Sequence, residues 1–203
     1  MELEAKFELL KKSDFKLPEK IAFYETGFFA WPLEIANLQE KYPPEIFLVQ
    51  HDIYHDDDKA ALKNNDRVLR NRRETLFTFN EKNEAQKKTR NLITYKGGRQ
   101  KSKYKLREEI EFEINPLIWN VFDNLGFQKT MSVKKFRWIS RIQKEIDVSL
   151  CFDLVENLGA YLEVETALTE DTANHEEKFT RFLKEENLTR YKIEKEPYTR
   201  LLS

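Results

Sequence analysis

Strict alternation between charged and apolar residues is the feature that most constrains this chain. It begins at Glu2-Leu3-Glu4-Ala5-Lys6, within a segment that runs from residue 1 to residue 9. Residues two apart in a β-strand point to the same side, so this pattern yields one charged face and one apolar face in an extended chain. Alternating or β-rich character returns at 46–54, 68–73, 91–96, 107–114, 133–139, 148–152 and 160–165. The pattern predicts about eight strands.

Three segments between the strands favour helices. One begins at Asn115-Pro116, where a capping residue precedes a proline at the first helical position, and ends at Gly126. The second spans 32–42. The third spans 171–186, and its Phe179 and Phe182 share one side, which indicates packing against the outside of a sheet.

Two lysine-rich segments, 82–90 and 97–105, are predicted to be exposed loops or hairpin connections. No repeat or linker interrupts the chain. Its length suits one sizeable core, so we expect a single domain over 1–203.

The balance of charges limits the kinds of partner. Charged residues make up 35% of the chain, but 35 Lys and Arg against 36 Asp and Glu leave a net charge of only -1. A chain this close to neutral does not predict the broad basic surface on which nucleic-acid affinity depends. The charges must be sorted in space, and no nucleic acid partner is expected.

Cysteine content and hydropathy indicate the compartment. The single cysteine, Cys151, cannot form an internal disulfide, which suits a reducing compartment, and its apolar neighbours predict a core position. No apolar segment approaches the roughly 18 residues that a membrane helix requires. We therefore expect a cytoplasmic protein with no membrane partner.

Charges of like sign recur two residues apart on several predicted strands, and therefore on one face of each. On any single strand, a water-exposed sheet face explains such a stripe. Neighbouring like charges repel, however, so their repetition favours a shared ligand over solubility alone. Turned inward in a barrel, the stripes would form a tunnel with basic and acidic walls. The pairs include Glu2 with Glu4, Arg70 with Arg72, Glu109 with Glu111, Lys135 with Arg137, and Glu163 with Glu165.

A tunnel of this kind predicts its ligand class. Arginine and lysine bind phosphate oxygens, and the arginine fork can do so with two hydrogen bonds. Carboxylates two apart on a strand can hold Mg²⁺ or Mn²⁺, which prefer oxygen ligands. A triphosphate compound with a divalent metal satisfies both walls.

Several strand motifs follow one another in a characteristic order along nearly the whole chain. They lie at 2–6, which reads Glu-x-Glu-x-Lys, and at 50–56, 68–72, 92–97, 107–111, 133–137 and 153–165. This set resembles the CYTH family, the triphosphate tunnel metalloenzymes, which include class IV adenylyl cyclases and thiamine or inorganic triphosphatases. The resemblance implies an α+β fold: a closed or nearly closed, antiparallel, eight-stranded β-barrel with peripheral helices.

The resemblance also implies roles for individual residues. The metal-binding wall would consist of Glu2, Glu4, Asp153, Glu163 and Glu165. Asp153 has the alternative of bonding Lys6 or a ligand water. The triphosphate-binding wall would consist of Lys6, Arg70, Arg72, Lys96, Arg107, Lys135 and Arg137, of which Lys6, Arg70, Lys96 and Lys135 are also expected to be catalytic. Lys135 is preferred to Lys134 because it shares a face with Arg137.

Three functions are consistent with these residues. The first is class IV adenylyl cyclase-like conversion of ATP to cyclic AMP and pyrophosphate, which the blocks at 50–54, 159–163 and 197–202 favour because they resemble the cyclase-like branch. The second is hydrolysis of inorganic, thiamine or nucleoside triphosphate by the same walls. The third is a module that binds a nucleotide or polyphosphate without turnover. A homodimer is considered as the assembly.

The segment 15–45 is longer than the first connection expected in this family, and it would cover one mouth of the tunnel. Its residues Tyr24, Phe28, Phe29 and Trp31 could stack on a base, although aromatic groups of this kind more often pack in a hydrophobic cover or core.

Overall fold

Nine strands make up one antiparallel sheet within the parts of the chain that the computed structural model describes, which are residues 1–11, 33–79, 85–168 and 171–202. The order of the strands is β5-β1-β9-β8-β7-β2-β3-β4-β6. Tyr24, Phe28, Phe29 and Trp31 lie outside the described residues. The strands are β1 (Glu2–Lys11), β2 (Ile46–Asp56), β3 (Val68–Phe79), β4 (Ala85–Lys96), β5 (Lys105–Arg107), β6 (Glu109–Glu113), β7 (Gln128–Gln143), β8 (Asp147–Val155) and β9 (Gly159–Ala167).

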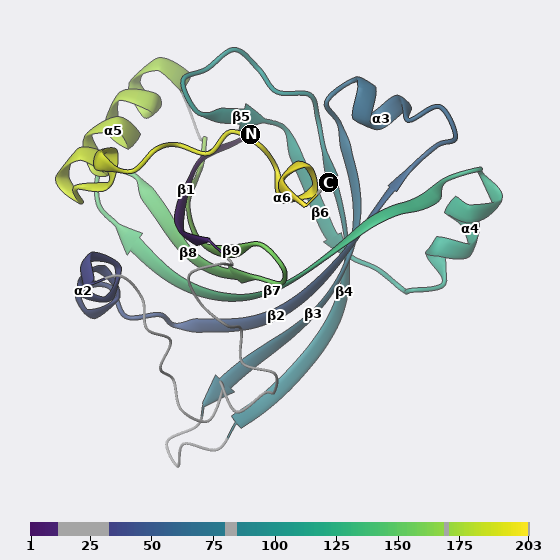
Figure 1. Ribbon diagram of the computed structural model, residues 1–203, viewed down its shortest axis with the longest axis horizontal. Helices are drawn as coiled ribbons and strands as arrows, with labels where there is room; N and C mark the ends of the chain where they lie inside the picture. The colour runs from purple at the N-terminus through teal and green to yellow at the C-terminus, as the bar shows by residue number, and fades with distance from the viewer. Residues whose placement is uncertain (12–32, 80–84, 169–170, 203) are drawn as a thin grey trace.

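The sheet is nearly closed into a barrel, because its two edge strands, β5 and β6, are consecutive in the chain (Figure 1). β5 pairs with β1 at one edge, where Arg107 lies opposite Glu2, and β6 pairs with β4 at the other edge, where Glu109 lies opposite Lys96. The strand predicted over 107–114 is therefore two strands. They separate at Glu108, whose backbone oxygen accepts a hydrogen bond of 2.9 Å from the Gly97 N–H. This accounts for nine strands where about eight were predicted.

The prediction of a loop over 82–90 was wrong from residue 85 onward. β4 begins at Ala85 and pairs with β3 in an unbroken register from Phe79 to Val68. Residues 86–90 of β4, which include two lysines, are exposed because this end of the strand projects past the rest of the sheet (Figure 1). Pairing with a long partner strand thus overrode a local composition typical of loops.

Short helices flank the sheet, and those predicted by the sequence are present. They are α2 (Leu33–Lys41), α3 (Ala61–Asn64), α4 (Ile118–Asn124), α5 (Thr172–Glu185), α6 (Tyr198–Leu201) and the 3₁₀ helix η2 (Leu188–Arg190). α4 begins slightly later than predicted, since Pro116 lies in a turn that the Asn115 side chain caps by accepting from the Leu117 N–H at 3.0 Å. Among the described helices, none has the length and apolar content needed to span a membrane.

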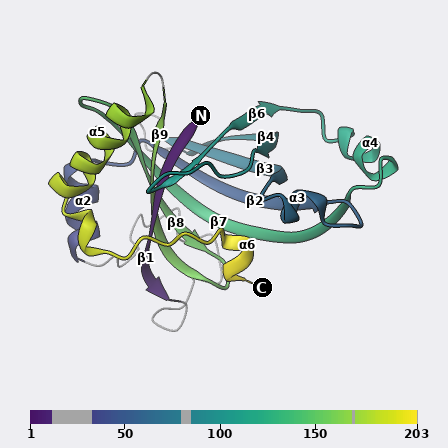
Figure 2. The same cartoon turned by 90° about the horizontal axis from the view of Figure 1, so that it is seen from above.

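The apolar faces of the strands point outward and form the main core under α5. Leu3, Ala5 and Phe7 of β1 are fully buried there, together with Phe179 and Phe182 of α5. Figures 1 and 2 both show α5 outside the curve of the sheet, as its apolar side predicted. The charged faces of the same strands are consequently turned inward.

The C-terminal helix α6 lies inside the curve of the strands (Figure 1). Its Tyr198 is buried in a small cluster with Val133, Val155 and Tyr161. The two tyrosine rings meet edge to face at a centroid distance of 5.1 Å. One end of the barrel interior is therefore filled by the end of the chain.

Candidate functional site

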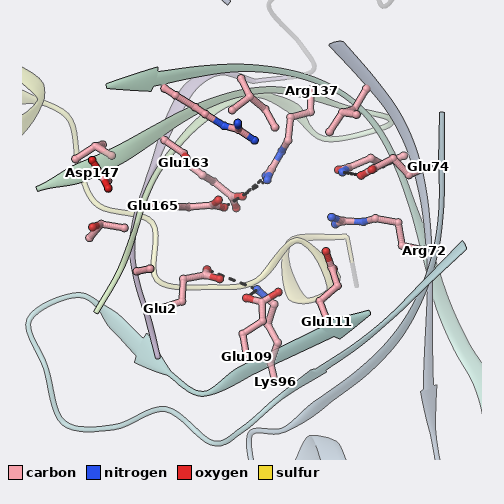
Figure 3. A pocket seen from close by; sticks show the side chains of 18 of the residues that line it. Glu2, Arg72, Glu74, Lys96, Glu109, Glu111, Arg137, Asp147, Glu163 and Glu165 are labelled. Atoms are coloured by element: carbon pink, nitrogen blue, oxygen red, sulfur yellow. Dashed lines mark hydrogen bonds and ion pairs between the residues drawn. The ribbon is translucent and has the colours of Figure 1, made fainter. Parts of the chain in front are cut away.

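A cavity of about 770 Å³ occupies the barrel interior, and side chains of both charges line it (Figure 3). They come from the inner faces of seven strands, as the period-two stripes predicted. Arg72 and Glu74 lie on one side of the view, and Glu163 and Glu165 lie on the opposite side. The charged lining residues are Glu2, Arg70, Arg72, Glu74, Arg90, Lys96, Glu109, Glu111, Lys135, Arg137, Arg141, Asp147, Glu163 and Glu165.

Arg70 and Arg72 of β3 are oriented by Asp52 of β2, to which the sequence analysis gave no role in the site. Arg72 donates to the two Asp52 oxygens at 2.6 and 2.8 Å, and Arg70 lies 3.4 Å from Oδ2. Burial would raise the pKa of Asp52, but the guanidinium groups of Arg72 and Arg70 outweigh it and hold that pKa well below its usual range. Parity could have identified Asp52, since it shares the inner face of β2 with Gln50.

Arg137 of β7 gathers the carboxylates of two neighbouring strands. Its Nε and Nη2 donate to Asp153 at 2.6 Å each, Nη2 also bonds Glu163, and Nη1 lies 3.4 Å from Glu165. Lys135 donates to the same Asp153 at 3.1 Å. Three of the predicted metal ligands, Asp153, Glu163 and Glu165, are thus ion-paired with Arg137 in this structure.

Three carboxylates form an acidic cluster, which consists of Glu2 and Glu4 of β1 and Glu165 of β9. One oxygen of each lies within 4.8 Å of the others. The cluster follows from register, because Glu4 and Glu165 are direct partners across the two strands. Burial raises the pKa of Glu2 and, with added repulsion from Glu163 and Glu4, that of Glu165. A cation would offset this repulsion, and an all-oxygen set is the kind that Mg²⁺ and Mn²⁺ prefer.

Lys105, a residue to which the sequence assigned no role, pairs with Glu4 of this cluster. Its Nζ lies 2.8 Å from Glu4 Oε1, and this pairing outweighs burial and lowers the pKa of Glu4. Arg107 lies opposite Glu2 in the β1 register, but it is not among the residues lining the cavity. The sequence reading had placed Lys105 in a loop, and only the pairing of β5 with β1 brings it inward.

Lys96 of β4 joins the acidic cluster to β6. Its Nζ bonds Glu109 and lies 3.7 Å from Glu2 Oε1. These two carboxylates outweigh burial and raise the pKa of Lys96 above its usual range. Arg70 reaches the same strand, since its Nη2 lies 3.2 Å from Glu111. Glu109 and Glu111 were recognised as a stripe but not assigned a role.

Lys6 is buried behind the cavity and does not line it. Its Nζ donates to the backbone oxygen of Glu196 and lies 4.2 Å from the ring centroid of Tyr198. Burial, together with the nearby Lys105, lowers the pKa of Lys6 to about 8. The Tyr198 hydroxyl in turn donates to Asp153 Oδ2 at 3.0 Å. The end of the chain therefore contacts two of the predicted site residues.

Cys151 is buried, as predicted, but on the inner face of β8. Its thiol lies 3.5 Å from Glu165 Oε2, and burial raises its pKa well above the usual range. Its neighbours Leu150 and Phe152 supply the apolar face. The thiol is adjacent to the acidic cluster and stays protonated.

These features define a β-tunnel with an acidic cluster facing an array of arginine and lysine side chains. Comparison with known proteins agrees: the family model "CYTH domain" matches residues 34–197. The chain therefore belongs to the CYTH domain family. The expected resemblance and the expected nearly closed antiparallel barrel with peripheral helices are confirmed.

Individual relatives show the same family likeness. A Methanocaldococcus jannaschii protein named "Putative adenylate cyclase MJ0240" is 29% identical over 156 residues, which cover 75% of this chain and 80% of that protein. The solved structure of protein PH1819 from Pyrococcus horikoshii has a TM-score of 0.72 at 24% identity and covers 100% of this chain and 98% of its own.

A third likeness is to a solved structure from Hippeastrum, "Putative adenylyl cyclase HpAC1", whose description reports a dominant triphosphatase activity. Its TM-score is 0.53 at 19% identity, over 92% of this chain and 88% of its own. At this identity the structural likeness concerns the fold.

Proposed function

We propose that this protein is a metal-dependent enzyme that cleaves the phosphate chain of a triphosphate compound inside the tunnel. The observation that carries the proposal is that Glu2 and Glu165, which cluster with Glu4, line the same cavity as Arg70, Arg72, Lys96, Lys135 and Arg137. Basic side chains alone suffice to bind a polyanion, whereas three carboxylates clustered beside them are suited to holding a metal ion together with it.

The basic side chains would bind and orient the phosphates. Arg72 and Arg137 each present a guanidinium group to the cavity while a buried aspartate holds the other side of the fork. Groups positioned in this way lose little entropy on binding, and they stabilise charge that develops on a leaving phosphate. Mg²⁺ or Mn²⁺ at Glu2, Glu4 and Glu165 would supply charge neutralisation and activation of the attacking oxygen.

The first candidate reaction is adenylyl cyclisation. The ribose 3′ oxygen of ATP attacks the α-phosphorus, the bond to the β-phosphate oxygen breaks, and pyrophosphate leaves with cyclic AMP as the other product. The sequence blocks of the cyclase-like branch support it, as does the name of the Methanocaldococcus jannaschii relative.

The second candidate is hydrolysis, in which water attacks the terminal phosphorus, the bond to its bridging oxygen breaks, and the diphosphate compound leaves with orthophosphate as the other product. The description of the Hippeastrum protein, which pairs a cyclase name with a dominant triphosphatase activity, favours this alternative. The same walls serve both reactions, because the position of the attacking oxygen distinguishes them.

The test is incubation of the purified protein with ATP or tripolyphosphate, with Mg²⁺ or Mn²⁺. Cyclic AMP with pyrophosphate identifies a cyclase, and orthophosphate without cyclic AMP identifies a triphosphatase. Tight binding without turnover in either metal would contradict an enzymatic role.

The assigned metal ligands are tested by Glu2→Gln and Glu4→Gln. Each should reduce metal-dependent turnover by at least about a hundredfold, a typical loss when preorganised charge is removed from an active site. Glu8→Gln is the matched control, because Glu8 lies on the same strand but is not one of the three clustered carboxylates. Unchanged turnover in Glu2→Gln and Glu4→Gln would refute the assignment.

A further inference from the structure

Gln50 and Glu74 form a buried polar pair on the cavity wall, next to the ionic groups described above. They are direct partners across β2 and β3, and they are 1% and 2% exposed. Gln50 Nε2 donates to Glu74 Oε2, and Arg90 Nε donates to Glu74 Oε1 at 2.8 Å. Both residues line the cavity.

The carboxylate determines which way the Gln50 amide faces. An ionised carboxylate only accepts hydrogen bonds, so the amide nitrogen must be the atom that meets Glu74. Gln50 Oε1 is thereby directed elsewhere, and no residue in the described part of the chain donates to it. A buried acceptor without a donor is unfavourable, and one that lies on a cavity wall can take its donor from a bound ligand.

The cavity lining changes character along two neighbouring strands at this point. On β2 the inner face passes from Asp52, which holds Arg72, through Gln50 to Leu48. On β7 it passes from Lys135 and Arg137 to Ile139, with Arg141 following on the same face. The apolar part of the lining is the part farther from α6. Tyr54, at the other end of β2 from Leu48, packs against the cluster that contains Tyr198 of α6.

A bare phosphate chain has no use for this second region. Leu48 and Ile139 offer apolar contacts, and a cavity of about 770 Å³ is in the size range of pockets that enclose a complete organic ligand. An apolar wall with a few polar groups for orientation is the usual composition of such pockets. Figure 3 shows Glu74 beside Arg72, so this region adjoins the groups that would bind phosphate.

We infer that Gln50 and Glu74 recognise the organic group of a nucleoside triphosphate by accepting hydrogen bonds from its amino or hydroxyl groups. Leu48 and Ile139 pack against the same group. This inference rests on the proposed function, and it makes nucleoside triphosphates preferred substrates over tripolyphosphate. The donor is either an exocyclic amino group of the base or a hydroxyl of the ribose.

The test compares kinetics with ATP and with tripolyphosphate for Gln50→Leu, which removes the acceptor and keeps the size of the side chain. The KM for ATP should rise about tenfold, the loss expected for one buried hydrogen bond, while kcat changes less than KM. Both constants for tripolyphosphate should stay within about twofold. The matched control is Gln143→Leu, a glutamine on the exposed rim of the same cavity, for which neither substrate should be affected.

Two further substrates separate the sources of the donor. Inosine triphosphate, which lacks the amino group of adenine, should abolish the difference between wild type and Gln50→Leu if the base is recognised. 2′-Deoxy-ATP should abolish it if the ribose is recognised. Equal losses for ATP and tripolyphosphate, or none for ATP, overturn the inference.

Binding measured by calorimetry keeps this test separate from the proposed reaction. If the wild type turns over no triphosphate, the proposed function fails, and the inference still predicts that Gln50→Leu weakens ATP binding and leaves tripolyphosphate binding unchanged. Gln50→Met serves as a second variant in case the first does not fold. If the wild type binds ATP no better than tripolyphosphate, the inference fails as well.

Discussion

The hydroxyl of Tyr198 should stabilise the protein far more than an ordinary tyrosine hydroxyl. Tyr198 is buried, and its hydroxyl donates to Asp153 Oδ2 at 3.0 Å inside the barrel. Asp153 is itself fully buried and bonded to Arg137 and Lys135. The hydroxyl therefore donates to a carboxylate that water cannot reach. If the hydroxyl is removed, no water molecule can replace it as a donor.

Tyr198→Phe removes this single bond and keeps the ring, so the contact of Lys6 with the ring at 4.2 Å is retained. A hydrogen bond to a charged group contributes about 1.5–3 kcal/mol, and the free energy of unfolding should fall by that amount. For a chain of this length the melting temperature should fall by about 3–12 °C. Urea unfolding followed by circular dichroism measures the free energy, and calorimetry measures the temperature.

Tyr191→Phe is the matched control. Its hydroxyl makes an exposed contact of 3.4 Å with Arg190, which predicts a loss below about 0.5 kcal/mol. If Tyr198→Phe also lost less than about 0.5 kcal/mol, the argument that a buried aspartate depends on this hydroxyl would be refuted.

Other predictions concern buried charge, backbone geometry and pH. Asp52→Asn leaves Arg70 and Arg72 without their shared counter-charge and should cost about 3–5 kcal/mol in urea unfolding, whereas the exposed Asp147→Asn should cost less than about 0.5. Gly159→Ala should lower the free energy of unfolding by over about 4 kcal/mol, because at φ +151° the added Cβ would lie 2.2 Å from the Leu10 backbone oxygen. Its control, Gly126→Ala, should lower it by about 1–2 kcal/mol, because Gly126 has a φ of +88° but lies in open space. Hydrogen bonds from Lys41, Tyr42 and Lys144 outweigh burial and lower the pKa of Glu186, so wild type should lose stability as pH falls below about 4.3, and Glu186→Gln should lose less over that range. Equal costs within either pair, or parallel pH profiles, would contradict these arguments.

The position and facing of most strands could be predicted from the sequence, because both depend on neighbouring residues. In an extended chain the side of each residue is set by parity, so Glu2 and Glu4, Arg70 and Arg72, and Lys135 and Arg137 had to share inner faces if they faced inward at all. The apolar alternation at Leu3, Ala5 and Phe7 in turn required that the opposite face be covered, and α5 covers it.

The grouping of these residues into working clusters was decided by tertiary structure. Which carboxylates meet depends on the register between strands that are far apart in the chain. Register places Glu165 beside Glu2 and Glu4, and it brings Asp153, Glu163 and Glu165 within reach of Arg137. Local patterns do not contain that information.

Closure of the barrel was decided in the same way. The break at Glu108 separates β5 from β6, so that Lys105 reaches Glu4 across 101 positions of sequence and Arg107 stays out of the cavity lining. The Gln50 acceptor is also a product of the fold, since its direction follows from the partner that β3 places beside it. The sequence by itself thus determined the kind of surface each strand presents, and the tertiary structure decided which of those surfaces meet, because long-range pairing alone brings distant side chains together.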